Sequence, residues 1–214
     1  SGSNQVGGNG GFGGGGGGSA GVGSQGGGNG GFGGGGGSPG YHDGSGGGAG
    51  GFGGGGGING LGGFGGGNGT TSISGGGGGG AGMGGGVFVQ NGGTLTIGGT
   101  LSENGDSVTK GTGASGGQDG SAFGGGIFYQ GANGTLTFAP GAGQSETISG
   151  DIADMSGSGG TGNNAGVYAL TLNGAGTLVL AGTDTYTGAT TLIDGTLQVD
   201  GAIANSAVSV QSGA

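Results

Sequence analysis

The chain has no cysteine and almost no positive charge, and each absence excludes a class of protein. Without cysteine there is neither a disulfide nor a thiolate metal ligand, so small disulfide-stapled scaffolds are excluded. Lys110 is the one Lys or Arg, against ten Asp and Glu, and the formal net charge is −9. Such a chain cannot neutralise a phosphate backbone, so nucleic acid and anionic membrane surfaces are poor partners.

Long hydrophobic runs and proline are also scarce. No apolar run reaches the length of about 18 residues that predicts a membrane-spanning helix, and residues 1–30 lack the features of a secretory signal peptide. With two prolines and no strict G-X-Y spacing, the 82 glycines do not indicate collagen. Because the last residues fall partway through another repeat, we interpret the sequence as a fragment or processed piece of a longer polypeptide.

Most of the glycine lies in residues 1–83, which we treat as a separate segment. Phe12, Phe32 and Phe52 follow one another at a constant interval of about 20 residues, and Phe64 follows after a shorter one. Three interpretations of this pattern remain open. The segment forms packed strands of polyproline-II type, whose close approach only glycine permits, or narrow β-helix coils, or a mobile linker.

Residues 84–214 carry most of the Leu, Ile, Val and Phe, in runs too short for core helices. Thr177–Leu180, Thr190–Ile193 and Thr196–Val199 are β-branched runs separated by turns centred on Gly, and the last run resembles the first. Period-two alternation predicts strands, and a repeat of about 20 residues indicates one coil of a solenoid. The chain is therefore predicted to be all-β.

A second repeat extends this prediction towards the N-terminus. Gly84–Gln90 resembles Gly124–Gln130 at twice the spacing of one coil, and each copy is followed by a turn and another strand. Leu95 is then expected directly above or below Leu136, while Ser102–Gly120 is expected to form a loop. About 130 residues at roughly 20 per coil predict six or seven coils.

One stretch resembles a known family. The sequence GAGTLVLAGTDTYTGATTLIDGTLQVDG, with Thr-Tyr-Thr-Gly at Thr185–Gly188, is similar to the strand repeat of autotransporter passenger domains. The resemblance covers about Leu172–Val210, and Gly124–Asp154 is similar to segments that precede the repeat in such passengers. It implies a right-handed parallel β-helix displayed outside a Gram-negative cell, with a downstream outer-membrane barrel that this sequence does not contain.

No group of residues predicts a catalytic or metal site. The pattern G-A-S-G-G at Gly113–Gly117 lacks the strand-to-helix context of a nucleophile elbow, and His42 is interpreted as a solvated loop residue. Three groups of acids come closest to a cation site, but none of them supplies enough oxygen ligands. They are Asp43, the pair Asp151 and Asp154, and the pair Glu103 and Asp106. N-G-T at Asn68 and Asn133 matches a glycosylation pattern that is uninformative in a bacterial chain. We therefore predict no catalytic residue, no metal and no cofactor.

The expected function is structural. We expect a surface-displayed or secreted stalk or adhesin module of an autotransporter, whose exposed Thr, Ser, Asn and Gln contact other cell-surface molecules, glycans or copies of the chain. A self-assembling extracellular fibre or biofilm matrix subunit is one alternative. Ice binding is another, although Thr does not recur in the sequence as a strict T-x-T ladder. An enzyme is not expected, because the chain has no Arg to line a catalytic groove.

Overall fold

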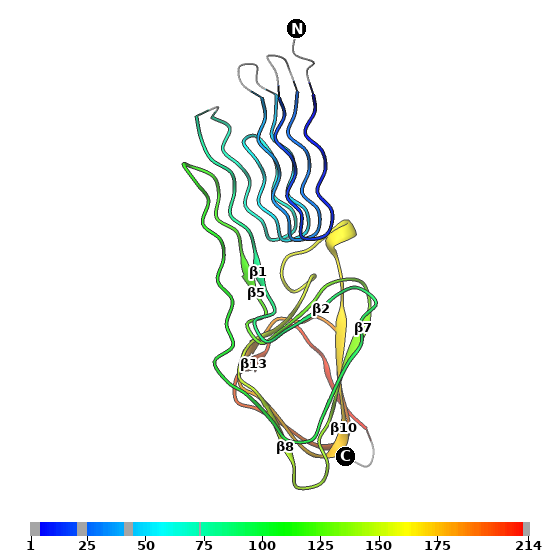
Figure 1. Ribbon diagram of the computed structural model, residues 1–214. Coiled ribbons are helices and arrows are strands. Elements are labelled where there is room, and N and C mark those ends of the chain that lie inside the picture. Colours follow the sequence, from blue (N-terminus) through cyan, green and yellow to red (C-terminus); the bar gives the residue numbers. More distant parts are fainter. Residues whose placement is uncertain (1–4, 21–24, 41–44, 73, 212–214) are drawn as a thin grey trace. The chain divides into compact units, whose positions relative to one another are not determined.

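The computed structural model describes residues 5–20, 25–40, 45–72 and 74–211 (Figure 1). The chain divides into two compact units, which we call the glycine unit (Ser1–Gly82 and Thr109–Ala122) and the β-helix unit (Met83–Val108 and Phe123–Ala214). Within the described ranges the regular elements are β-strands and one 3-10 helix, η1 (Gly162–Asn164). The prediction of an all-β chain is confirmed.

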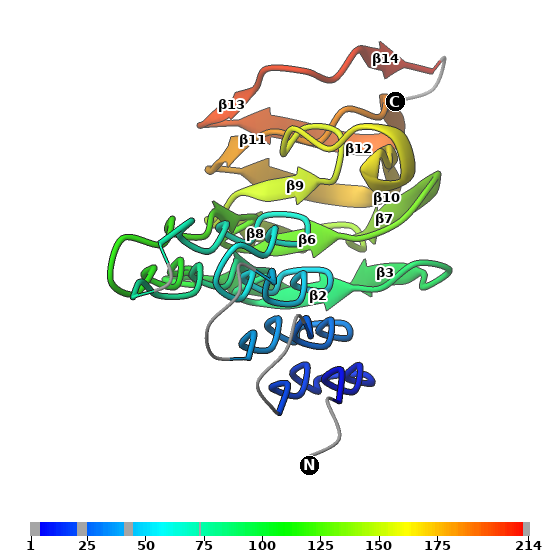
Figure 2. The same ribbon diagram turned by 90° about the horizontal axis from the view of Figure 1, so that it is seen from above.

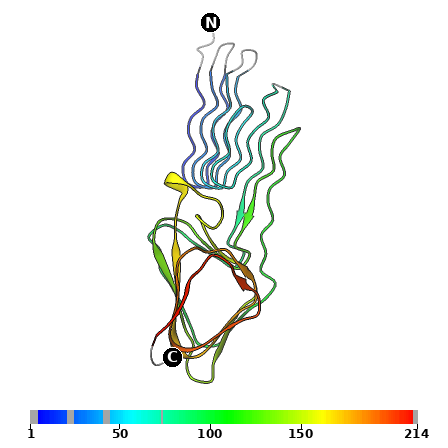
Figure 3. The same ribbon diagram turned by 180° about the vertical axis from the view of Figure 1, so that it is seen from behind.

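The β-helix unit is a stack of rungs joined by parallel strand pairing, as predicted for a parallel β-helix. Figure 2 shows the rungs side by side, and in Figure 3 they overlie one another as a closed loop. The described residues form five rungs. Their strands are β2 (Val87–Val89), β3 (Leu95–Gly98) and β4 (Leu101–Glu103); β6 (Ile127–Tyr129), β7 (Gly134–Ala139) and β8 (Ser145–Ile148); β9 (Ile152–Asp154) and β10 (Tyr168–Leu180); β11 (Thr183–Asp184) and β12 (Thr190–Val199); and β13 (Ala202–Ile203) and β14 (Val208–Val210).

Two short strands, β1 (Gly82–Met83) and β5 (Ala122–Phe123), pair with each other at the boundaries of the two units. The largest sheet has the order β14-β12-β10-β7-β3, and β8 pairs with both β4 and β10. Strand β10 is long because it passes through a corner. Its register with β12 shifts between Leu172 and Thr177, so it pairs with β7 before the corner and with β8 after it.

The pairing register aligns side chains of one kind from rung to rung. Leu95 pairs with Leu136, as predicted, and Leu136 pairs with Leu170. Leu136 and Leu170 are each 1% exposed, whereas the neighbouring Thr135 is exposed. The period-two alternation of the sequence therefore places the apolar side chains inside the coil, where each is covered only by the rungs next to it.

Five rungs, rather than six or seven, are present in the described residues. Two excursions explain the difference. Residues 104–121 leave the stack between the first and second rungs, and residues 155–167 leave it between β9 and β10. The expected six or seven coils assumed that all of the roughly 130 residues belong to coils of constant length, and so included these two excursions.

The glycine unit is built from a ten-residue hairpin, which we call the glycine hairpin. In its first copy, the N–H of Gly17 donates to the carbonyl of Gly8 (2.8 Å) and that of Gly14 to Gly11 (2.9 Å). The same two bonds recur in every copy, and each copy has glycine at its first, third, sixth, seventh and tenth positions. The described part of the unit contains five copies, at residues 8–17, 28–37, 48–57, 60–69 and 111–120.

Successive hairpins are joined by hydrogen bonds at every third residue. In the first layer, residues 5–20, the N–H groups of Gly7, Gly10, Gly13 and Gly16 donate to carbonyls of the second layer, residues 25–40, at N···O distances of 2.6–3.1 Å. Residues 27–36 repeat the pattern towards the next layer. Three residues per turn is the period of polyproline II, so the structure takes the first of the three forms considered, packed strands, which Figure 1 shows as wavy ribbons lying side by side.

Glycine is required here because backbones touch. A Cβ atom at Gly31 would lie 1.8 Å from the carbonyl oxygen of Gly11, and one at Gly51 would lie 1.8 Å from that of Gly31. Any side chain at these positions would therefore force the layers apart.

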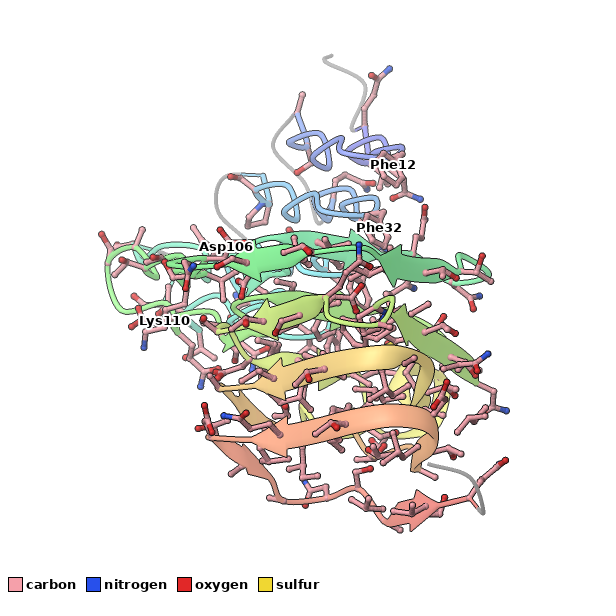
Figure 4. The ribbon with its side chains drawn as sticks, turned by 90° about the horizontal axis from the view of Figure 1, so that it is seen from below. Phe12, Phe32, Asp106 and Lys110 are labelled. Carbon is pink, nitrogen blue, oxygen red and sulfur yellow. The ribbon has the colours of Figure 1, made fainter. Side chains whose placement is uncertain are left out.

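The phenylalanines occupy the hairpin turns. The residue that follows each Phe is a glycine with φ between +71° and +77°, as a type II turn requires. The rings form a continuous stack: centroids are 5.0 Å apart for Phe12 and Phe32, 5.1 Å for Phe32 and Phe52, and 5.2 Å for Phe52 and Phe64. Figure 4 shows Phe12 and Phe32 on the same side of successive layers.

The loop expected at Ser102–Gly120 is confirmed in part, because residues 104–121 leave the stack of rungs. Strand β4 continues to Glu103, and residues 111–120 form the fifth glycine hairpin, with Ser115 in the place of phenylalanine. The sequence pattern of Phe and Gly did not predict this hairpin, because Ser115 stands where the other copies have phenylalanine. The glycine spacing alone would have revealed it.

Candidate binding surface

A column of hydroxyl side chains crosses the outward face of the largest sheet. Its members pair in register from β3 to β14, one per rung. They are Thr96, Thr137, Thr171, Thr191 and Ser209. Because neighbouring strands lie about 4.8 Å apart, the column is a row of donors and acceptors at that spacing. We call it the hydroxyl ladder.

The sheet has no strict T-x-T ladder, as expected, but a single column of hydroxyl groups does recur from rung to rung. The recurrence is hidden in the sequence because the two excursions lengthen the first two intervals, so that Thr96 is much further from Thr137 than Thr191 is from Ser209. The ladder is nevertheless only one column wide. In the outward column two positions earlier, Thr135 pairs with Ala169, so the second threonine of a T-x-T face is missing from the third rung.

A shallow open hollow adjoins the ladder where β7 and β10 begin, with a volume of about 300 Å³. It is lined by small, uncharged residues: Asn133, Gly134, Thr135, Val167, Ala169, Gly188 and Ala189. An open hollow of this size admits a sugar ring or a short side chain, but it does not enclose a ligand as an active-site cavity does. Asn133, which the sequence offers as a glycosylation acceptor, lies at its edge in a left-handed conformation (φ 45°).

The Thr-Tyr-Thr-Gly motif packs its tyrosine into the coil. Tyr186 is 2% exposed, and its hydroxyl shares a hydrogen bond of 2.6 Å with the Thr190 hydroxyl. The Thr190 hydroxyl also lies 2.7 Å from that of Ser206, which in turn donates to the carbonyl of Gly188. The motif therefore anchors the start of β12 by a buried chain of hydroxyl groups and is a structural element.

Asp154 joins three segments of the coil. Its Oδ1 accepts a hydrogen bond from the N–H of Gly157 (2.6 Å). Its Oδ2 accepts from the N–H of Tyr168 (3.1 Å), the N–H of Thr187 (2.7 Å) and the hydroxyl of Thr187 (2.9 Å). With four donors on a fully buried carboxylate, Asp154 holds both ends of the excursion at residues 155–167 against the turn after β11.

Glu146 occupies a position inside the coil where leucine is expected. It pairs with Leu101 on one side and Leu178 on the other, and its side chain is fully buried. Neither carboxyl oxygen has a hydrogen-bond partner in the described part of the chain. Burial raises the pKa of Glu146 to about 7, because the charged form loses its hydration.

Asp184 is a second buried acid. Its Oδ1 accepts a hydrogen bond from the N–H of Ile152 (2.8 Å), while its Oδ2 has no partner among the described residues. Burial, with a smaller contribution from the neighbouring charge of Asp151, raises the pKa of Asp184 to about 7 against the lowering effect of the Ile152 bond. The sequence shows Glu146 and Asp184 as ordinary acids next to turns, and only the strand register reveals that they point inwards.

The remaining candidate residues do not assemble into a site. Asp151 accepts from the N–H of Thr183, and Glu103 accepts from the N–H groups of Ser149 and Gly150. No group of three or more His, Cys, Asp or Glu that could hold a metal ion occurs among the described residues.

The G-A-S-G-G pattern is the turn of the fifth glycine hairpin, where φ is 40° at Ser115 and 91° at Gly116. This turn explains the pattern without a nucleophile. His42 and Asp43 lie outside the described residues.

One segment of the chain matches a known protein family. Residues 170–199 match the passenger-associated-transport-repeat family. In the structure these residues run from Leu170 in β10 through the Thr-Tyr-Thr-Gly motif to the end of β12. Because Leu170 pairs with Thr190, the match spans about one and a half turns of the coil. The resemblance to the passenger repeat is confirmed there, whereas Gly124–Asp154 lies outside the matched residues.

Comparison with curated proteins and with solved structures gave no match. Across the described ranges, no helix has the length and apolar character needed to cross a membrane.

Proposed function

Starting from a chain that carries a passenger-associated transport repeat, we propose that it is a structural passenger module of a bacterial autotransporter, displayed at the cell surface or released from it. The observation that carries the proposal is that the matched segment forms about one and a half turns of a stacked parallel coil, with its two long strands paired in parallel. Stacked coils form a stiff support on which exposed side chains are held at fixed spacing.

We further propose that the module is adhesive and that its binding surface is the hydroxyl ladder with the adjoining hollow. Uncharged hydroxyl groups at about 4.8 Å spacing suit a partner that is itself rich in hydroxyl groups, such as an extracellular polysaccharide. The net charge of −9 disfavours anionic polymers, so a neutral glycan is the expected class of ligand.

We propose a binding role rather than an enzymatic one. General acid and base chemistry needs two titratable groups that face one substrate. The buried acids of this unit point into the coil or are occupied by backbone donors, and the surface with the best ligand geometry presents hydroxyl, amide and methyl groups.

A binding assay tests the adhesive role directly. The purified chain is applied to an array of neutral and anionic polysaccharides, together with the triple variant Thr137→Val, Thr171→Val, Thr191→Val. Valine preserves shape and removes the hydroxyl groups, so binding to the neutral glycans should fall at least tenfold, about 1.4 kcal/mol.

The matched control is Thr177→Val, Thr196→Val, which alters a different outward column of the same coil. Equal loss in both variants, or no binding to any glycan, would refute the adhesive role. Because the ladder is one column wide, we expect no thermal hysteresis in freezing assays, and clear hysteresis would favour ice binding instead.

Surface display is tested separately. The chain is fused upstream of a transporter barrel and expressed in a Gram-negative host, and intact cells are then treated with protease. We expect cleavage of the chain in intact cells, and protection until the outer membrane is broken would contradict display.

A further inference from the structure

The sequence contains eight Asn-Gly pairs, each of which can in principle modify itself. The backbone nitrogen of the glycine can attack the side-chain Cγ of the asparagine before it, because glycine has no side chain to hinder the approach. The asparagines of these pairs are Asn9, Asn29, Asn59, Asn68, Asn91, Asn104, Asn133 and Asn173. Since the reacting pair is the same in every case, differences in reactivity must come mainly from the fold.

The reaction is redox-neutral and consumes only water. The glycine nitrogen loses its proton and forms a bond to Cγ, the Cγ–Nδ2 bond breaks, and Nδ2 leaves as ammonia with that proton. Water then opens the resulting cyclic imide at either of its carbonyl carbons, which yields aspartate or isoaspartate. The attack requires a glycine N–H that is not held by an acceptor, and enough room around the glycine for the ring to close.

The N–H group of the glycine is free in two of the eight pairs. Those of Gly92 and Gly105 donate to no acceptor in the described part of the chain, and the asparagine before each is exposed. Gly174 lies inside strand β10. In the remaining five pairs the glycine N–H donates to a backbone carbonyl at an N···O distance of 2.7–3.2 Å. These five glycines are Gly10, Gly30, Gly60, Gly69 and Gly134.

The space around each glycine divides the eight pairs in the same way. A Cβ atom at Gly92 or at Gly105 would meet nothing within 4 Å, and these residues lie outside the strands with φ of 83° and 80°. At each of the other six glycines a Cβ atom would lie 1.8–2.4 Å from its nearest neighbour. Hydrogen bonding and local space therefore single out the same two pairs.

We propose that Asn91 and Asn104 are self-modification sites of the folded chain, at which asparagine is converted to aspartate or isoaspartate, and that the fold protects the other six pairs. Both sites lie in the first rung of the β-helix unit, Asn91 between β2 and β3 and Asn104 directly after β4. The inference does not depend on the adhesive role.

Conversion at Asn104 would alter the contact between two rungs. Its Oδ1 accepts a hydrogen bond from the hydroxyl of Ser149 (3.0 Å), and its Nδ2 donates to the hydroxyl of Ser102. An oxygen in place of Nδ2 removes the donor to Ser102 and adds a negative charge next to Glu103 in the sequence. The corner that follows β4 should therefore loosen as the protein ages.

Peptide mapping by mass spectrometry on the full chain tests the proposal. The folded chain is incubated at mildly alkaline pH, where the glycine nitrogen loses its proton more readily, and samples are digested with pepsin in acid, where the reaction is slow. Asn91 and Asn104 should convert at least about tenfold faster than the other six asparagines, because a paired amide must first be released by local opening. Conversion at Asn91 and Asn104 that is no faster than at the protected pairs would overturn the proposal.

The same chain in denaturant is the matched control. All eight pairs should convert there at similar rates, because the fold no longer distinguishes them. If the preference for Asn91 and Asn104 persisted in denaturant, neighbouring residues rather than the fold would select the sites, and the proposal would be wrong.

A variant that opens one protected pair tests the cause of the protection. The N–H of Gly30 donates to the carbonyl of Ala49 in the third layer (2.8 Å), and a Cβ atom at Gly51 would force the second and third layers apart. In Gly51→Ala, Asn29 should convert faster and the Gly30 amide should exchange its hydrogen faster, while Asn133 keeps its rate. Asn29 should stay protected if Gly30 still exchanges slowly. Fast exchange at Gly30 without faster conversion of Asn29 would refute the protective role of the hydrogen bond and with it the proposal.

Discussion

In the glycine unit, layers are joined at every third residue by backbone hydrogen bonds, whereas the β-helix unit pairs its strands continuously and buries alternate side chains. The first three glycine hairpins and the last three rungs of the β-helix both repeat after about 20 residues. The comparison shows that a common period does not imply a common structure. Side chains fill the interior of the coil in the β-helix unit, whereas backbones contact each other directly in the glycine unit. Different substitutions should therefore damage each unit.

The largest effect is expected from a charge inside the coil. Leu178 is fully buried between Glu146 and Leu197, so Leu178→Asp places a second unpaired acid beside the first. We expect a loss of at least about 4 kcal/mol and cooperative unfolding of several rungs. Thermal melts followed by circular dichroism measure this, with the exposed Thr196→Asp as control. An unchanged melt of the Leu178 variant would mean that the coil is not packed by its inward columns.

A single methyl group should have a comparable effect in the glycine unit. Gly51→Ala places a Cβ atom 1.8 Å from the carbonyl oxygen of Gly31, so the second and third layers must separate. Amide hydrogen exchange of residues 45–58 should become fast, a loss of about 3 kcal/mol in local protection. Gly11→Ala occupies the corresponding position in the first layer, and strong deprotection by that variant would contradict the packing described here.

Replacement of the buried carboxylate at Asp154 is expected to have the next largest effect. In Asp154→Asn the amide nitrogen would face donors, so at least one buried hydrogen bond is lost, at about 2–3 kcal/mol. Chemical denaturation measures the loss. Asp200→Asn is the matched exposed control and should change stability by less than about 0.5 kcal/mol. If both variants behave alike, Asp154 does not hold the excursion in place.

Removal of the acid at Glu146 should stabilise the coil in a way that depends on pH. The folded chain retains a proton on Glu146 between about pH 4.5 and 7, where the unfolded chain has lost it, so the free energy of unfolding falls as pH rises through this window. Glu146→Leu completes a leucine column and should raise stability at pH 8 by about 2 kcal/mol, with a smaller change at pH 4.5. A gain that is equal at both pH values would show that Glu146 is not buried as an acid.

The β-helix was predictable because its signal is local. Alternation within Thr135–Phe138 and the echo of Gly84–Gln90 in Gly124–Gln130 each specify strands without knowledge of the neighbours. The packed glycine strands could be named only as one of three forms, since glycine has no side chain whose pattern reports a neighbour.

The hydroxyl ladder and the buried acids could not be read from the sequence. Both depend on which residues face each other across rungs, and the excursions change the spacing from one rung to the next. Glu146 shows the difficulty most clearly, because its alternation with Ser145 and Thr147 has the polarity of an exposed strand.

The glycine hairpins are separated by long connectors between the first three copies but by only Ile58 and Asn59 between the third and fourth. Since backbone groups make most of the hydrogen bonds between the layers, duplication or loss of one copy creates contacts that are already compatible. A gene encoding this unit can change its number of layers by unequal recombination without compensating substitutions, whereas each new turn of the β-helix must bring matched side chains with it.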